Sequence, residues 1–296
     1  GSGLRPAQWR PYLVQRAERL GQLEMRSALR PALAMHEVLL FRIHAALASF
    51  GTVAVGEQRP SQTHPAKSQV IGLVAAALGV RRDEEMRLAQ LANGFGMAVL
   101  QIADGSLLRD YHTAQVPSQS DLNKAPHASR RDELRAAPRQ ELNTILSTRD
   151  YRSETVHVVA LWRRATELPP LTAIQAALEQ PVFVPYVGRK SCPLSLPMAP
   201  QVVQADSLKA AFAAELAGFH ARWQQLNGGR KPSSRQPLSQ HPTWLFWEDG
   251  DSLDPPAGLV SMQTHSRNDA SLSRRRWQFG SRLEQIAAWS VQEATP

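Results

Sequence analysis

Apolar residues along this chain fall into short runs that show two different spacings. Residues 38–43 (VLLFRI) form a β-branched and aromatic run of the length expected for a buried strand. Residues 67–79 (KSQVIGLVAAALG) instead repeat their apolar positions at helical spacing, with Pro65 before them and Gly79 at their end, as helices prefer. The first run predicts a strand and the second a helix.

The same two patterns alternate through the rest of the chain. Helices are predicted at 83–93, 171–179 and 208–226, the last ended by Gly228 and Gly229, and strands at 94–102, 155–162 and 244–247. This alternation predicts an α+β fold of the RRM or ferredoxin-like type, with one sheet and helices on one face of it.

One internal stretch, residues 116–140, follows neither pattern. It holds three prolines, several serines and almost no large apolar side chain, and its cations are Arg130, Arg131, Arg135 and Arg139 beside one lysine. An excursion of this length inside a domain is usually functional or disordered. Its charge suits RNA contact, and a solvated flexible loop explains it equally well.

The two ends of the chain differ from the middle. Gly1-Ser2-Gly3 resembles a cloning remnant, and Met35 is a plausible true start, so residues 1–34 are predicted to be an N-terminal extension or fusion remnant. A basic amphipathic helix is the other interpretation of this part. Residues 35–205 are predicted to form the main domain, and residues 206–296 a C-terminal helix, a linker at 230–242 and a basic tail.

Charge and cysteine content narrow the class of protein. The 296 residues carry a formal charge of +8 and a pI of about 10.2, which favours a polyanionic partner, although many basic proteins bind no nucleic acid. The single cysteine, Cys192, excludes an intrachain disulfide and a multi-cysteine zinc site, and it has no identified base, so we expect a packed thiol in a reducing cytoplasm. The longest uncharged apolar run, 70–80, is too short for the roughly 20 residues that span a bilayer.

Three segments hold candidate binding chemistry. Lys67 and Ser68 stand at a predicted helix N-terminus, where free N–H groups suit a phosphate and where a serine cap with an exposed lysine is the plainer interpretation. In residues 185–193 (PYVGRKSCP), two cations follow Gly188, where the backbone can approach a ligand; a basic turn without a ligand is the alternative.

The third segment, residues 107–115 (LLRDYHTAQ), offers a cation, an aromatic ring, an imidazole and a hydroxyl close together. These groups bind single-stranded RNA through phosphates, stacked bases and 2′-hydroxyls. Residues 148–151 (TRDY) repeat part of the pattern. The alternative is that Tyr111 and Tyr151 pack and that Arg109 pairs with an aspartate.

Read together and in order, these segments resemble one family. ALASFG (46–51), residues 59–79, LLRDYHTAQ, residues 143–162, PVFVPYVGRKSCP (181–193) and SRRRWQFG (273–280) are similar to segments of the CasD family, the RAMP-superfamily subunit that holds the 5′ end of the CRISPR RNA in type I-E Cascade. The likeness covers nearly everything from residue 35 to residue 280. Phe50 replaces the tryptophan usual after the first strand, and the excursion is longer and richer in arginine than the family pattern.

The resemblance implies a RAMP domain with a protruding β-hairpin thumb at about 116–142 and a smaller C-terminal part. It implies a non-catalytic, cytoplasmic subunit without a cofactor or metal that clamps the 5′ handle of the crRNA, contacts the large PAM-reading subunit and the backbone subunits, and meets target DNA through the complex. The residues expected to line the handle are Lys67, Ser68, Arg109, Tyr111, His112, Thr113, Gln115, Arg130, Arg131, Arg149, Tyr151, Tyr186, Arg189, Lys190 and Ser191.

Two other functions stay open from the sequence. Relatives in subtype I-C cleave precursor CRISPR RNA with Tyr, Lys and His, and Tyr111, Lys67 and His112 lie in comparable segments, so a metal-independent endoribonuclease is the runner-up. A DNA-binding or generic scaffold protein that uses its basic surface is the third.

Overall fold

The computed structural model describes residues 35–52, 54–124, 126–226, 243–248, 262–274, 276 and 278–289. The chain divides into two compact units, Gly1–His36 and Glu37–Pro296, and the description below concerns the second. The predicted extension at 1–34, the linker at 230–242 and the glycines at 228 and 229 lie outside the described residues.

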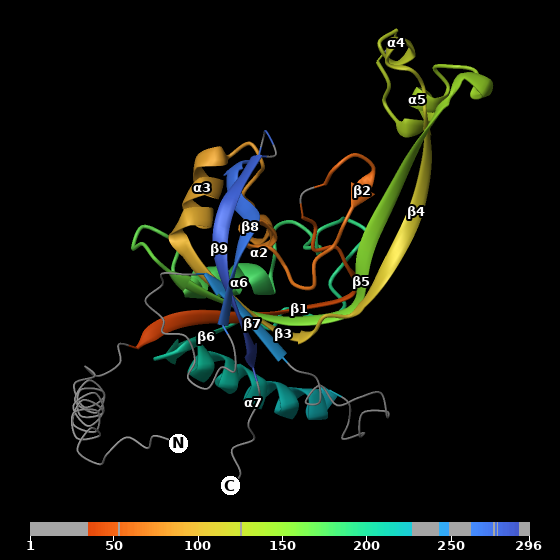
Figure 1. The fold of residues 1–296 in the computed structure, drawn as a ribbon. Helices are drawn as coiled ribbons and strands as arrows, with labels where there is room; N and C mark the ends of the chain where they lie inside the picture. Colours follow the sequence, from red (N-terminus) through yellow and green to blue (C-terminus); the bar gives the residue numbers. More distant parts are fainter. Residues whose placement is uncertain are drawn as a thin grey trace, which may run out of the picture. The chain divides into compact units, whose positions relative to one another are not determined.

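The described strands form one nine-stranded, largely antiparallel sheet (Figure 1), in which β2 pairs with β5 in parallel. Its order is β6-β1-β5-β3-β7-β9-β8, with β2 and β4 also paired to β5. The strands are β1 (His36–Ala48), β2 (Gln58–Arg59), β3 (Phe95–Ala103), β4 (Ser106–Val116), β5 (Asn143–Arg163), β6 (Gln201–Ala205), β7 (Thr243–Glu248), β8 (Met262–Ser273) and β9 (Gln278–Trp289).

Strand β5 connects the sheet to a long hairpin that leaves it (Figure 1). Its second half lies between β1 and β3, whereas its first half pairs only with β4 and the short β2. The change of direction falls where Gly105 and Glu154 both have positive φ, +70° and 58°. A methyl on Gly105 would lie 2.0 Å from the Ser153 carbonyl oxygen, so only glycine fits this close approach.

The β4–β5 hairpin begins earlier along the chain than the thumb predicted at 116–142. Its arms run from Ser106 to Val116 and from Asn143 onward, and the predicted range forms only the far end. That end contains the short helices α4 (Gln119–Leu122) and α5 (Arg130–Leu134) and the 3-10 turn η2 (Arg139–Glu141), so it is not a featureless loop. LLRDYHTAQ is therefore a strand of the hairpin.

Helices cover both faces of the sheet, which corrects the prediction of one covered face. One face is covered by α2 (Lys67–Ala77), α3 (Glu85–Gly94) and α6 (Leu171–Glu179). Phe41 and Ile43 of β1 belong to the core cluster that these helices form with the sheet. On the other, α7 (Leu208–Leu226) contributes Phe212 to a core cluster that includes Leu40. Burial on both faces explains why residues 38–43 read as a continuous apolar run.

The element limits follow the local signals where these are strong. Helices α2, α6 and α7 match their predicted positions, α3 is displaced by one or two residues, and Gly79 ends α2 in the left-handed conformation with φ +73°. Besides the two-residue β2, the strands missed from the sequence are β4, β6, β8 and β9. Strands β4, β8 and β9 carry many exposed polar side chains, so they lack the apolar runs that predict a strand.

Candidate nucleic-acid interface

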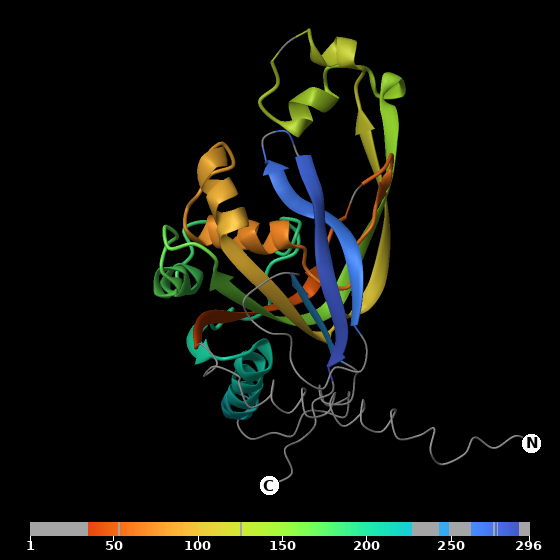
Figure 2. The ribbon, with the colours of Figure 1, turned by 60° about the vertical axis from the view of Figure 1, so that its left-hand side comes forward.

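A large groove lies between α2, the loop at 183–190 and the tip of the β8–β9 hairpin, which rises beside α3 (Figure 2). Its volume is about 1500 Å³, and its lining includes four cations and the two carboxylates of Asp83 and Asp269. We call it the basic groove. Its main lining residues are Ser68, Gly72 and Ala76 of α2, Phe183, Tyr186 and Lys190 of the loop, Leu272, Arg274 and Phe279 of the hairpin, and Arg81 and Arg82 after α2.

The loop that forms one wall is held by backbone contacts. Val187 accepts a hydrogen bond from the Ser49 N–H at 3.1 Å and donates one to the Cys192 carbonyl at 2.8 Å. Gly188 has φ +85°, and a methyl there would lie 1.9 Å from the Ser49 carbonyl oxygen. Only glycine fits this turn, which sends Arg189 toward the β4–β5 hairpin and Lys190 into the groove wall.

Cys192 ends this turn, and its side chain lies in the core. Its side chain is fully buried, which confirms the packed thiol, and burial raises its pKa. Ser191 beside it is exposed, with its hydroxyl 4.0 Å from the Cys192 sulfur. The turn therefore joins the core to the surface over a few residues.

The two arms of the β4–β5 hairpin present different faces, because successive side chains of a strand alternate. The pairings Leu108 with Tyr151 and Asp110 with Arg149 place Tyr151, Arg149 and His112 on one side, which we call the Tyr151 face. The Arg189 guanidinium lies 4.4 Å from the centre of the Tyr151 ring and donates to the Arg59 carbonyl at 3.4 Å. Arg189 thus links the Tyr151 face to the wall of the basic groove.

The opposite side, the Tyr111 face, carries Arg109, Tyr111, Thr113 and Gln115. Tyr111 is 65% exposed, so the alternative that it packs is wrong. Arg109 donates to both oxygens of Asp150, at 2.8 and 3.2 Å, which confirms the alternative that it pairs with an aspartate. These hydrogen bonds lower the pKa of Asp150.

The remaining predicted side chains lie at the end of the hairpin or along it. Arg130 and Arg131 are exposed on α5, and Arg130 bonds to the Gln115 carbonyl and, at 2.6 Å, to Glu133. His112 is 3.8 Å from Asp110, and Arg149 donates to the Ser147 hydroxyl at 3.1 Å. Apart from Lys67, the structure therefore divides the predicted residues among the groove with its loop, the two hairpin faces and the far end of the hairpin.

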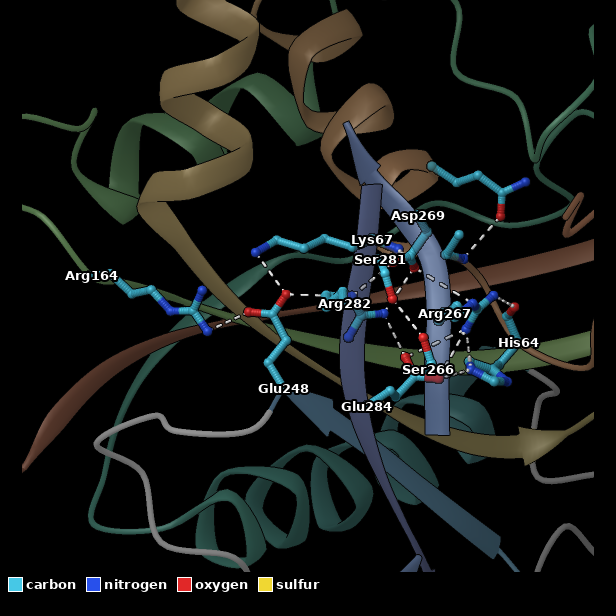
Figure 3. Close-up of polar contacts among 12 residues, drawn as sticks. His64, Lys67, Arg164, Glu248, Ser266, Arg267, Asp269, Ser281, Arg282 and Glu284 are labelled. Atoms are coloured by element: carbon cyan, nitrogen blue, oxygen red, sulfur yellow. Dashed lines mark hydrogen bonds and ion pairs between the residues drawn. The ribbon is translucent and has the colours of Figure 1, made fainter. Parts of the chain in front are cut away.

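Lys67 belongs to a buried ion-pair network and not to an exposed surface (Figure 3). Only 6% of the residue is exposed, and its ammonium lies 2.7 Å from a Glu248 oxygen. Its backbone N–H donates to Asp269 at 2.9 Å, so the anion that faces the start of α2 is a carboxylate of the protein itself. Ser68 lies inside the helix, whose N-cap is Ala66, so the serine-cap alternative is wrong.

The network continues into the β8–β9 hairpin and was missed in the sequence. Arg282 donates to both oxygens of Asp269 at 2.8 Å and to Glu284 at 2.7 Å. Arg267 also reaches Glu284, at 3.2 Å, and Arg164 pairs with Glu248 (Figure 3). The sequence does contain a signal for this network. Arg267 and Asp269 on β8, and Arg282 and Glu284 on β9, are two residues apart, and residues at this spacing share one face of a strand.

His64 joins this network from the segment before α2. Its ring stacks on Phe246 with 3.5 Å between ring centres, and its Nε2 lies 2.9 Å from Glu284. The Arg267 guanidinium also contacts this nitrogen, so His64 lies between a carboxylate and a cation of the network. Burial lowers the pKa of His64 to about 4; burial alone would raise the pKa of Glu284, but the hydrogen bond from His64 and the nearby arginines lower it to about 2.

The network fixes the β8–β9 hairpin against α2, and the hairpin supplies groove residues that were not predicted. Arg274 and Phe279 come from it, and Arg81 and Arg82 follow α2. The segment SRRRWQFG (273–280) was identified in the sequence through the family resemblance. Its contact with α2 could not be predicted, because nothing in the local sequence indicates which element it meets. Among the described residues no group of three His, Cys, Asp or Glu side chains suits a metal ion, and no described helix is long and apolar enough to cross a membrane.

A large, mostly antiparallel sheet with helices, a long hairpin and a basic groove defines a mixed α/β protein with a basic binding surface. The sequence model of the family described as CRISPR-associated protein (Cas_Cas5) matches residues 38–283. The chain belongs to this family, which confirms the resemblance found in the sequence.

One named protein is similar in sequence, and one solved structure is similar in fold. The chain is 29% identical over 193 residues to the "CRISPR system Cascade subunit CasD" of Escherichia coli (strain K12), covering 62% of this chain and 80% of that protein. A solved structure titled "CRISPR RNA-guided surveillance complex" has a similar fold, with a TM-score of 0.53 and 21% identity over 86% of this chain and 90% of that one.

Proposed function

We propose that this protein is the non-catalytic subunit of a cytoplasmic type I-E Cascade that binds and caps the 5′ handle of the crRNA. In this role it links the backbone subunits to the large PAM-reading subunit. The observation that carries the proposal is the basic groove, which continues through Lys190 and Arg189 to Tyr151 on the hairpin.

The chemistry of this surface suits single-stranded RNA. Arg82, Lys190 and Arg274 offer charge to phosphates, and Tyr186 and Phe279 offer rings to unstacked bases. An exposed Tyr111 on the other hairpin face adds a ring that a base or a neighbouring subunit could cover. Family membership favours guide RNA over DNA as the ligand.

The geometry supports a role without cleavage. Tyr111 and His112 are adjacent on β4, so their side chains leave opposite faces of the hairpin. Lys67 is buried against Glu248. The three residues that the endoribonuclease alternative requires therefore do not converge on one point.

A competition experiment tests RNA binding. Labelled RNA carrying the repeat-derived 5′ handle is bound to the full chain, and unlabelled handle RNA, scrambled RNA or duplex DNA is added. We expect the handle RNA to compete at least tenfold better than the others. Equal competition by all three would instead support a generic basic scaffold.

A cleavage assay tests the runner-up. Repeat RNA is incubated with the protein in EDTA, and intact RNA is expected. Specific cleavage that is lost in His112→Ala would establish the endoribonuclease and reject the non-catalytic role. Co-purification with the neighbouring subunits, with sequencing of the bound RNA, tests the assignment to the complex.

A further inference from the structure

Gly72, in the middle of α2, leaves space for a single side chain. A methyl at this position would lie 2.7 Å from the Arg274 Nη2 and 3.9 Å from its Cζ, and apart from its chain neighbours and the backbone of its own helix it would meet no other atom within 4 Å. Glycine is a poor helix former compared with alanine, so its presence here favours the contact with Arg274 over helix stability.

Arg274 lies against this notch in the wall of the basic groove. Its Nη2 is 3.4 Å from the Ser68 carbonyl oxygen, and its guanidinium is 5.9 Å from the centre of the Phe279 ring. These contacts hold a half-buried cation at a defined place on the surface of α2.

A second arginine lies in the same part of the groove. Arg82 is 3.4 Å from the Tyr186 hydroxyl and lines the groove with Arg274. Burial lowers the pKa of Arg274, and the charge of Arg82 lowers it further, which shows that the two cations act on each other. An anion between them would remove this repulsion, and guanidinium groups match the oxygen spacing of a phosphate.

We propose that one phosphodiester of the bound RNA lies between Arg274 and Arg82 beside the Tyr186 hydroxyl, with Gly72 as the positioning residue that keeps Arg274 in place. This inference rests on the RNA-binding function proposed above. It assigns a phosphate contact to the SRRRWQFG segment and a purpose to a glycine inside a helix.

The test is Gly72→Ala in the full chain. The atom that a methyl would meet is the far end of a flexible side chain, so Arg274 moves and the fold remains. We expect a melting temperature equal to or above that of the wild type, together with an affinity for handle RNA about tenfold lower. The matched control is Gly280→Ala in β9 of the same hairpin, where the atoms nearest to a methyl belong to Leu272, at an ordinary 3.4 Å, and affinity is expected to stay within about twofold.

The position of the phosphate is tested with RNAs in which one linkage at a time is an uncharged methylphosphonate. The wild type is expected to lose about tenfold in affinity at one linkage, and Gly72→Ala to show no extra loss there. Arg274→Gln is expected to behave like Gly72→Ala, whereas Arg276→Gln, with the same charge change at the exposed tip, retains the linkage-specific loss.

The outcomes separate the two proposals. If the wild type does not prefer handle RNA, the RNA-binding function fails and this site fails with it. If the wild type binds handle RNA but Gly72→Ala and Arg274→Gln bind equally well and keep the same linkage profile, only the phosphate site is rejected. Should Gly72→Ala lower the melting temperature, Arg274→Gln alone decides.

Discussion

Two tyrosines in nearly identical sequence settings have different environments in the structure. Tyr111 and Tyr151 both follow Arg-Asp, on paired strands of the β4–β5 hairpin. Tyr151 packs against the core and under Arg189, whereas Tyr111 is mostly exposed. In the strand pairing, Tyr151 is opposite Leu108 and Tyr111 is opposite Thr148. Leu108 and Tyr111 are an odd number of residues apart on β4, so the two tyrosines lie on opposite sides of the hairpin. Their contributions to folding and binding should therefore differ.

Tyr111→Ala is expected to leave the free energy of unfolding within about 0.5 kcal/mol of the wild type, because the ring is exposed. If a base stacks on this ring, affinity for handle RNA falls by about 1–3 kcal/mol. Thermal unfolding and RNA titration measure the two effects, and Tyr111→Phe, which keeps the ring, is the control. An unfolding loss as large as the binding loss would contradict an exposed binding role.

Two buried histidines make the stability of the protein depend on pH. Burial lowers the pKa of His64 to about 4 and that of His157 to about 3, from 6.5 in a model peptide. The unfolded chain binds these protons more tightly, so the stability they provide is complete above pH 6.5 and is lost as pH falls toward the folded values.

We expect the free energy of unfolding to fall between pH 6.5 and pH 4, by up to about 1.4 kcal/mol per pH unit for each histidine. Denaturant unfolding at pH 7, 6 and 5 measures the slope. His157→Gln should flatten it, because an amide can still donate to the Thr63 carbonyl, 3.0 Å away from the imidazole, without titrating. An unchanged slope in this variant would remove His157 as a cause.

At the scale of elements, the buried ion pairs connect three segments far apart in sequence. Lys67 begins α2, Glu248 ends β7, and Arg282 and Glu284 lie on β9. A buried pair contributes little net stability, but removing one partner leaves a charge without compensation. The network therefore fixes the position of the β8–β9 hairpin more than it adds free energy.

Lys67→Met is expected to lower the free energy of unfolding by about 2–4 kcal/mol, somewhat less than for an isolated buried pair because Arg164 still pairs with Glu248. Denaturant unfolding measures this loss, and Lys190→Met, at an exposed cation, is the control. A lysine that served mainly to contact RNA would instead lose affinity with little change in stability, and that result would contradict the buried role.

At the scale of the unit formed by residues 37–296, the groove and the Tyr151 face present cations from the loop at 183–190, the segment after α2 and the β8–β9 hairpin along one path. Each phosphate neutralised by a cation releases counterions, so affinity falls linearly on a log–log plot against salt. The slope of this plot reports how many contacts the path makes.

Lys190→Ala is expected to reduce the magnitude of this slope by about 0.7, the value for one phosphate of a single strand. RNA titrations between low and moderate salt measure it. Lys209→Ala, on α7 at the other face of the sheet, should leave the slope unchanged. An equal reduction in both variants would mean that the protein attracts RNA by net charge alone.

The sequence by itself determined the helices α2, α3, α6 and α7, the apolar strand segments in β1, β3, β5 and β7, and the family, since each depends on local periodicity, terminating residues or motifs such as LLRDYHTAQ and GRKSCP. It did not reveal that Lys67 is buried, because the carboxylate opposite it, Glu248, lies far along the chain. Only the tertiary structure brought Gly72, Arg82 and Arg274 into one groove and put Tyr111 and Tyr151 on opposite faces. The physical reason is that periodicity sets which residues share a face of an element, whereas register and packing decide what that face meets.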